Sequence, residues 1–96
     1  MMIIISYDVD FTETHGAKRL RKVAKICGRY GVRVQNSVFE TIVDSAQFAL
    51  LKSELNNVID IERDTVRFYN LGNKWDSKIS SIGKDKGFKQ DDVLIL

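Results

Sequence analysis

Short apolar runs alternate along this chain with two longer stretches in which hydrophobic residues recur at helical spacing. The first run, residues 2–7, is unbroken and rich in β-branched residues, which predicts a strand buried on both faces. Further β-rich or alternating runs cover residues 32–35, 38–43 and 64–71. Turn-forming residues separate these runs, so the pattern predicts four strands in this part of the chain.

Residues 16–30 and 46–59 have the 3.6-residue period of amphipathic helices. The apolar stripe of the first segment consists of Leu20, Val23, Ala24, Cys27 and Tyr30. The stripe of the second consists of Phe48, Leu51, Leu55 and Val58. We expect the region Thr12–Thr14 to cap the first helix, Gly31 to end it, and Asp44-Ser45 to cap the second helix.

The resulting order, β-α-β-β-α-β, is the split βαβ pattern of the ferredoxin-like fold, an α+β architecture. In that fold the first strand is central and both helices cover one face of the sheet. The other face carries apolar residues, and a second copy of so small a chain is the simplest cover, which predicts a homodimer. We therefore expect a ferredoxin-like domain at residues 1–72 and a C-terminal segment at 73–96 that packs on the dimer. The apolar tail Val93–Leu96 should add an extra C-terminal strand to a sheet edge.

Charge is distributed unevenly along the 96 residues, although the formal net charge is only +2. From Thr14 to Phe39 there is no acidic residue, while the rest of the chain is net acidic. Such a one-sided field suits a polyanion, although a basic solvated helix face would give the same pattern. The candidate nucleic-acid-binding residues in this stretch are Lys18, Arg19, Arg21, Lys22, Lys25 and Arg33.

Several functional classes are disfavoured by composition. No apolar run approaches the ~18 residues of a membrane span, and no signal-peptide pattern follows the apolar start, so we expect no membrane partner. The single cysteine cannot form an internal disulfide, which favours the cytoplasm. One cysteine and one histidine cannot fill a four-ligand zinc site. Cys27 falls on the apolar stripe of a predicted helix, where thiols are usually inert.

The strongest candidate for chemistry is Asp8, which ends the first predicted strand in the sequence Tyr-Asp-Val-Asp. In an extended chain Asp10 would point to the same side, and a carboxylate pair suits Mg²⁺, with Mn²⁺ as an alternative. The competing interpretation is that one aspartate caps the helix and the other is solvated. If a dimer axis brought two copies of Asp8 together, their repulsion would require a cation or a shared proton.

Three further residues have both a functional and a structural interpretation. His15 could act as a general base, but a lone histidine near a helix start is more often exposed. Tyr69 and Trp75 could stack on bases, whereas a tryptophan in a small domain is more often an apolar anchor.

Three blocks of the chain resemble the second of the two universal CRISPR adaptation proteins, the Cas2 family. The blocks are MIIISYD at Met2–Asp8, AKRLRKVAKICGRYGVRVQNSVFE at Ala17–Glu40 and VRFYNL at Val66–Leu71. The most specific piece is RVQNSVFE, at this distance from an N-terminal Tyr-Asp. The pieces LGNKW, SSIGKDKG and DVLIL further resemble the group found with subtype I-C systems. The resemblance spans essentially the whole chain.

This resemblance implies a ferredoxin-like homodimer that bridges two dimers of a CRISPR integrase subunit and holds new spacer DNA. It also implies a metal-dependent endonuclease, acting on RNA in some members and on double-stranded DNA in others. The family's metal aspartate falls on Asp8, its basic first helix on Lys18–Lys25, and its arginine and phenylalanine on Arg33 and Phe39. Val-Asp-Phe-Thr follows the Tyr-Asp where family members commonly differ, so Asp10 is a weaker candidate ligand than Asp8.

Two functional hypotheses follow. In the first, a metal held by Asp8 of both subunits activates water for phosphodiester hydrolysis, and Arg33 stabilises the charge that develops. In the second, the chain is a non-catalytic DNA-binding scaffold in which Asp8 matters only for the interface. A third hypothesis, a small-molecule regulatory domain on the same fold, is disfavoured by the basic stretch and by the missing glycine-rich ligand turn.

Overall fold

The computed structural model describes residues 1–89, and the predicted element order is present there. Both predicted helices and all four strands begin and end within about one residue of the boundaries expected from the sequence. The elements are β1 (Met2–Asp8), α1 (Gly16–Tyr30), β2 (Gly31–Gln35), β3 (Val38–Ile42), α2 (Ser45–Val58), β4 (Thr65–Gly72) and a short 3₁₀ turn, η1 (Asp76–Lys78).

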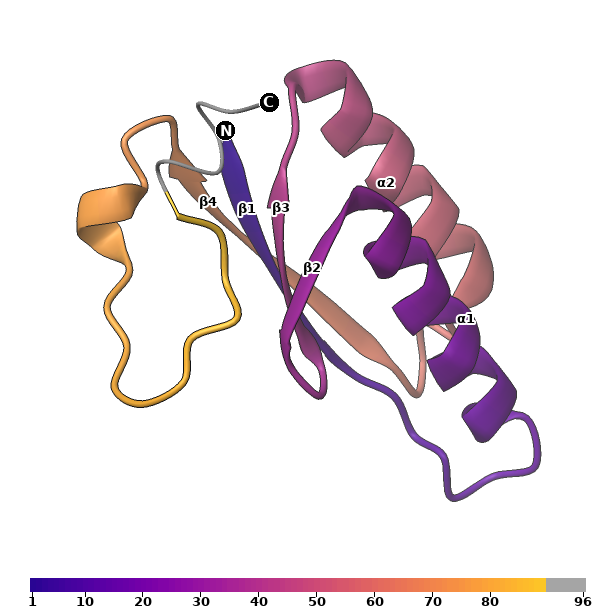
Figure 1. The fold of residues 1–96 in the computed structure, drawn as a ribbon. Coiled ribbons are helices and arrows are strands. Elements are labelled where there is room, and N and C mark those ends of the chain that lie inside the picture. The colour runs from indigo at the N-terminus through magenta and orange to yellow at the C-terminus, as the bar shows by residue number, and fades with distance from the viewer. Residues whose placement is uncertain (90–96) are drawn as a thin grey trace.

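Within the described residues the strands form one antiparallel sheet in the order β2-β3-β1-β4. Strand β1 is central, as predicted, and Ile5 lies opposite Phe39 on one side and Phe68 on the other. Figure 1 shows α1 and α2 together on one side of the sheet, with residues 73–89 on the other. This arrangement is the ferredoxin-like fold, so the predicted fold class is confirmed.

The core lies between the sheet and the two helices. Alternate residues of β1 point into it, and each helix contributes the stripe that its period predicted. The fully buried side chains of this layer include Ile3, Ile5, Val23, Cys27, Leu51 and Leu55. Burial raises the pKa of the Cys27 thiol to about 12, so this cysteine is a packing residue and not a nucleophile.

The two helices begin in different ways. Helix α2 has a reciprocal capping box, in which the Asp44 carboxylate accepts the Gln47 N–H (2.7 Å) and the Gln47 side chain accepts the Asp44 N–H (2.9 Å). Helix α1 starts after His15 with no side-chain cap, so the cap predicted at Thr12–Thr14 is wrong. The hydroxyl of Thr12 instead bonds the Asp10 side chain within the preceding loop.

Helix α1 passes directly into β2 with no intervening loop. Gly31 ends the helix as predicted, but its backbone is extended (φ −163°) and it is the first residue of the strand. A Cβ at Gly31 would collide with the carbonyl oxygen of Glu40 on β3, so the close approach of two strands requires glycine here. The helix and the edge strand are therefore joined as a continuous unit.

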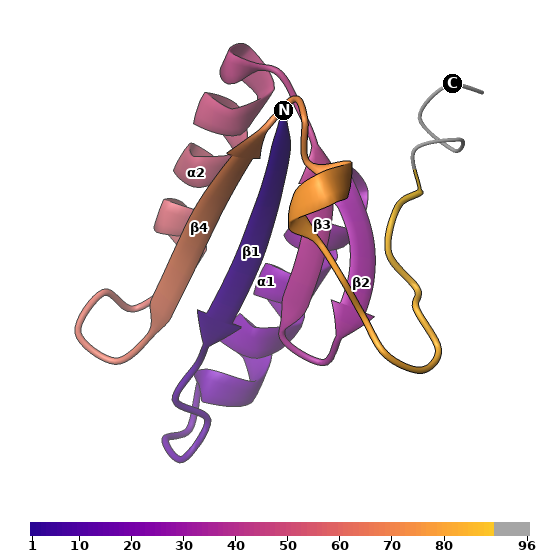
Figure 2. The ribbon, with the colours of Figure 1, turned by 90° about the vertical axis from the view of Figure 1, so that its left-hand side faces the viewer.

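Residues 73–89 cross the sheet face that the helices leave open, as Figure 2 shows. Trp75 is only 5% exposed, which confirms it as an apolar anchor. The Phe88 N–H donates to the buried Glu40 carboxylate (2.9 Å) and holds the end of this segment on β3. Residues 73–89 contain no strand, and the tail strand predicted at Val93–Leu96 lies outside the described residues.

Candidate nucleic-acid and metal site

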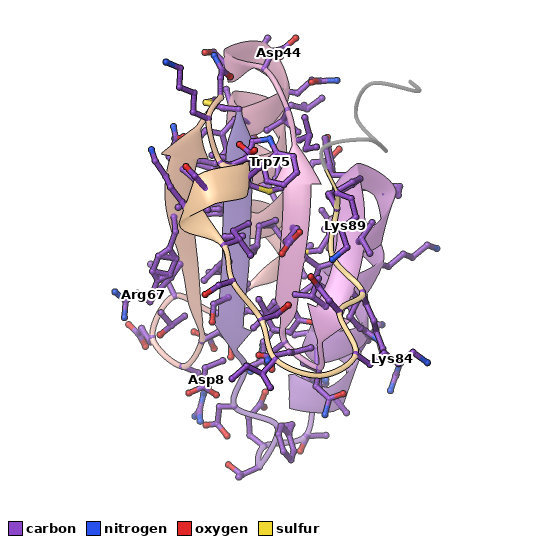
Figure 3. All side chains as sticks on the ribbon, turned by 60° about the vertical axis from the view of Figure 1, so that its left-hand side comes forward. Asp8, Asp44, Arg67, Trp75, Lys84 and Lys89 are labelled. Atoms are coloured by element: carbon purple, nitrogen blue, oxygen red, sulfur yellow. The ribbon has the colours of Figure 1, made fainter. Side chains whose placement is uncertain are left out.

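Asp8 is the last residue of β1 and lies opposite Thr65 of β4. Figure 3 shows it at the end of the sheet away from Asp44, beyond which the chain leaves the sheet. Its carboxylate is exposed, and none of residues 1–89 donates a hydrogen bond to it or pairs with it. The predicted metal ligand is thus presented to solvent with its full coordinating capacity.

A depression of about 470 Å³ opens beside Asp8, between the end of β1, helix α1 and the β2–β3 turn. Its lining is mostly apolar, with charged groups at three points. The lining residues are Tyr7, Asp8, Val9, Phe11, Leu20, Arg21, Ala24, Arg33, Asn36 and Ser37. Three residues predicted for the site, Asp8, Arg21 and Arg33, therefore meet in one place, although they are far apart in the sequence.

One wall of this depression is held by aromatic packing. The Arg33 guanidinium lies over the ring of the buried Phe39, 5.2 Å from its centroid, and Phe39 packs in turn on Tyr7. The Tyr7 hydroxyl donates to the Asn36 carbonyl oxygen (3.2 Å). Burial raises the pKa of Tyr7 despite the nearby Arg33, so this hydroxyl stays protonated as a hydrogen-bond donor. This aromatic packing positions the Arg33 guanidinium, which keeps its positive charge available for a bound anion.

The outer face of α1 carries the predicted cations. Lys18, Arg21, Lys22 and Lys25 are exposed at spacings of three and four residues, which place them along one side of the helix. None of the four pairs with an acidic side chain of residues 1–89. Lys25 and Arg33 line a second shallow depression beside Phe39, so the basic face continues onto β2.

Arg19, which is also predicted to bind nucleic acid, departs from this pattern because it is paired with two acidic side chains. Its side chain is 13% exposed and pairs with Glu13 and with Asp64 (2.8 Å), while a third bond reaches the Asp10 carbonyl oxygen (3.2 Å). The hydrogen bonds that the guanidinium donates, to Asp64 first and then to Glu13, raise its pKa. Arg19 therefore links the loop before α1 to the loop before β4, and these two loops support the site. Its guanidinium donors are already used in these bonds, which leaves few of them for a phosphate.

The Asp10 side chain also takes part in contacts that hold the loop before α1. Asp10 lies two residues beyond the end of β1, outside the strand pairing that fixes the direction of Asp8. Its carboxylate accepts the backbone N–H and hydroxyl of Thr12 and pairs weakly with Arg63 (3.4 Å). The hydrogen bonds from Thr12 are the main cause of its lowered pKa. The structure therefore uses Asp10 to shape the loop instead of adding it to Asp8.

A metal ion would find one free carboxylate here. No group of three or more potential ligand side chains occurs in the part of the chain that the structure describes. Such a sparse donor set does not suit zinc, but it fits Mg²⁺, which keeps several waters and binds through one or two carboxylates plus phosphate oxygens. Asp8 is thus the residue that would hold the ion, with the substrate completing the site.

Two residues of this region were not singled out in the sequence. Asp64 is buried and accepts hydrogen bonds from Arg19 and from the backbone of Asp60 and Asp10. Its position just before β4 is typical of an ordinary turn residue, and two of its three partners are 45 and 54 positions away. Phe11 also lines the depression, and in the sequence it stands out only as part of the Val-Asp-Phe-Thr segment that differs from the family pattern. His15, by contrast, is exposed as expected.

Comparison with known proteins gives a consistent result over the whole chain. A sequence model described as CRISPR associated protein Cas2 matches residues 1–79. The chain is 52% identical over 95 residues to a protein of Halalkalibacterium halodurans named CRISPR-associated endonuclease Cas2, covering 99% of each. It is 47% identical to the CRISPR-associated endoribonuclease Cas2 of Nitratidesulfovibrio vulgaris, covering 100% of this chain and 94% of the relative.

The fold agrees with this result. The crystal structure of Streptococcus pyogenes Cas2 at pH 6.5 superimposes with a TM-score of 0.76 at 47% identity, covering 86% of this chain and 100% of that one. None of the helices within residues 1–89 is long and apolar enough to cross a membrane.

Proposed function

The chain belongs to the Cas2 family of CRISPR-associated proteins, and from this premise we propose that it is an adaptation endonuclease whose site is centred on Asp8. Its curated relatives are named endonucleases or endoribonucleases, and the chain shares that nuclease role. The position of the site is inferred from the Asp8 carboxylate, which has no partner among residues 1–89 and lines one depression with Arg21 and Arg33. Loss of metal-dependent cleavage on substitution of Asp8 is the direct test.

The reaction is hydrolysis of a phosphodiester bond, in which water attacks phosphorus and one P–O bond breaks. Mg²⁺, with Mn²⁺ as the alternative, would be held by Asp8 and supplies Lewis-acid charge and a bound water of lowered pKa. Arg33, held over Phe39, places a fixed positive charge where the phosphate gains negative charge. Arg21 binds a neighbouring phosphate and orients the chain of the nucleic acid across the depression.

A second candidate function is a non-catalytic DNA-binding scaffold that bridges integrase dimers during spacer integration. It is favoured by the length of the basic face, because Lys18, Lys22 and Lys25 project from α1 outside the depression at Asp8. A protein that only cut would not need them, whereas a protein that holds duplex DNA does. The two functions can coexist, and they differ in whether Asp8 is required for cleavage. The integrase partner and the association with subtype I-C systems remain proposals based on the sequence resemblance.

We also propose that the working unit is a homodimer in the cytoplasm. The sheet face opposite the helices carries Ile4, Val34 and Val38, and residues 78–86 cover it only partly, over a cavity of about 610 Å³. Asp8 follows Ile4 on the same face by strand alternation, so a second copy on this face would approach it. A single buried cysteine is compatible with a reducing compartment.

The first prediction concerns salt. Five cations remain available after Arg19 is removed from the set, so DNA affinity should fall with a log–log salt slope of about −4 to −5. Fluorescence anisotropy of a labelled duplex across a KCl series measures this slope. A slope near zero would mean that the basic face of α1 does not carry binding.

The second prediction concerns sequence dependence. Charge reversal at Arg21 and Lys25 together should weaken binding to unrelated duplexes by the same factor, because phosphate contacts carry no base information. The matched control is Lys52→Glu on α2, whose ammonium lies over Phe48 and lines neither of the depressions beside Arg33. Competition among several duplexes measures the factor, and a loss confined to one of them would contradict phosphate recognition.

A further inference from the structure

Phe11 is a large aromatic side chain that the fold leaves in water. It lies in the loop between β1 and α1 and is 66% exposed. It does not belong to the core cluster, yet it lines the depression that holds Asp8, Arg21 and Arg33. An exposed aromatic ring beside two guanidinium groups and a carboxylate is not explained by folding.

The backbone under this ring is fixed. The Asp10 N–H donates to Asp64 (3.0 Å), and its carbonyl oxygen accepts from Arg19 (3.2 Å). Gly16, the first residue of α1, lies so close that a Cβ there would collide with the carbonyl of Asp10 and the Cα of Phe11. The loop is therefore packed against the helix start while its aromatic ring stays outside. Such a ring needs little reorganisation before it can bind a flat ligand.

The surroundings of the ring match the parts of a nucleotide. Aromatic faces stack on bases without regard to sequence, and guanidinium groups bind phosphates. Asn36, which also lines the depression, carries an amide that can bond to base edges. A depression of about 470 Å³ lies within the range of small-ligand sites. The apolar lining, with Val9, Leu20 and Ala24, suits a base better than it suits a second phosphate.

We propose that Phe11 stacks on one unpaired base next to a phosphate bound by Arg21 and Arg33, so that the site takes single-stranded or frayed nucleic acid in preference to closed duplex. In a closed duplex each base is stacked on both faces, and presenting one to Phe11 costs a few kcal/mol of unstacking. An unpaired base avoids that cost. This inference rests on the proposed function, since it assumes that the depression binds nucleic acid. Its test, however, measures binding and not cleavage.

The test compares Phe11→Ala and Phe11→Trp with the parent chain. The matched control is Ile61→Ala, because Ile61 is also an exposed apolar residue of a loop, at 76% exposure. The probes are a short DNA strand, the RNA of the same sequence and the fully complementary DNA duplex, each containing 2-aminopurine and measured in EDTA to prevent cleavage. Phe11→Ala should weaken binding of both single strands about 5- to 100-fold and remove the change in 2-aminopurine emission that accompanies binding. Phe11→Trp should retain both, and duplex affinity should change less than about 2-fold.

Three results would overturn the inference. Equal losses on single strands and duplex would make Phe11 a general contact, and unchanged binding would leave it without a role in recognition. A change in oligomeric state by light scattering, with single-strand binding intact, would make the ring a contact with a second copy. Failure of the proposed function is seen separately, because cleavage that survives Asp8→Ala leaves the stacking measurement unaffected.

Discussion

Asp8→Ala should abolish metal-dependent cleavage of nucleic acid, with a loss of at least about 100-fold, while the protein stays folded. The carboxylate is exposed and has no partner among residues 1–89, so its removal breaks no internal bond. Only its capacity to hold a cation beside Arg33 is lost. Cleavage of end-labelled single-stranded RNA and duplex DNA, each with Mg²⁺, with Mn²⁺ and with EDTA, measures the effect and identifies the substrate. EDTA alone should reduce the parent chain to the level of the variant.

The control is Asp76→Ala, which removes an exposed acidic residue of the 3₁₀ turn on the C-terminal segment. Light scattering before the assay ensures that parent and variants have the same oligomeric state. DNA binding in EDTA should be kept or improved in Asp8→Ala, because one negative charge has left the basic surface. Cleavage that persists in a correctly assembled Asp8→Ala protein would leave Asp8 as a structural residue, and the scaffold would become the better account.

Among the residues that hold the two loops beside the site, Asp64 should be the one whose replacement by alanine lowers stability most. The Asp64 carboxylate is fully buried and accepts from Arg19 (2.8 Å), the Asp60 N–H (2.9 Å) and the Asp10 N–H (3.0 Å). Its removal leaves these donors unsatisfied, which should cost about 3 kcal/mol and lower Tm by roughly 12–24 °C. Thermal unfolding followed by circular dichroism measures the shift. Glu62→Ala, an exposed acidic residue of the same loop, should change Tm by less than about 2 °C.

The same group gives a pH dependence with a definite sign. Burial acts to raise the pKa of Asp64, but the hydrogen bonds from Arg19 and from the two backbone N–H groups outweigh it, so the pKa lies below its ordinary value. A carboxylate with a depressed folded pKa contributes its full stability above about pH 4 and loses it as the pH falls through the folded value. Below pH 4 the difference in Tm between the parent chain and Asp64→Ala should shrink. A constant difference down to pH 2 would contradict the ion-pair account.

The fold could be predicted from the sequence because its elements are defined by local patterns. The apolar run at the start is continuous enough to require a central strand, and the stripe from Leu20 to Tyr30 has a single helical period. Asp44 and Gln47 lie three positions apart, so the capping box of α2 is visible in the sequence itself. Gly31 was correctly identified as the end of a helix, but its reason is the nearby Glu40 carbonyl, which belongs to another strand.

The site could be predicted only in part, because its support depends on contacts between distant residues. Arg19 belongs by composition to the basic face of α1, and only the three-dimensional position of Asp64, 45 residues later, turns it inward. Asp10 has the right spacing to join Asp8 only if the strand continues, and the strand ends first. Exposed residues carry no periodic signal, so the importance of Phe11 became visible only when the depression placed it beside Arg21.

The direct passage from α1 into β2 has a mechanical consequence. Tyr30 ends the helix and Gly31 begins the strand, which is held against β3. The four exposed cations of the basic face, Lys18, Arg21, Lys22 and Lys25, therefore share one backbone unit with Arg33. The backbone positions that carry these side chains are therefore fixed relative to one another, and only the flexible side chains can adjust to a bound strand. In the proposed binding mode, a nucleic acid whose phosphate spacing matches these positions makes every contact, and one with another spacing bends, slides or leaves contacts unmade.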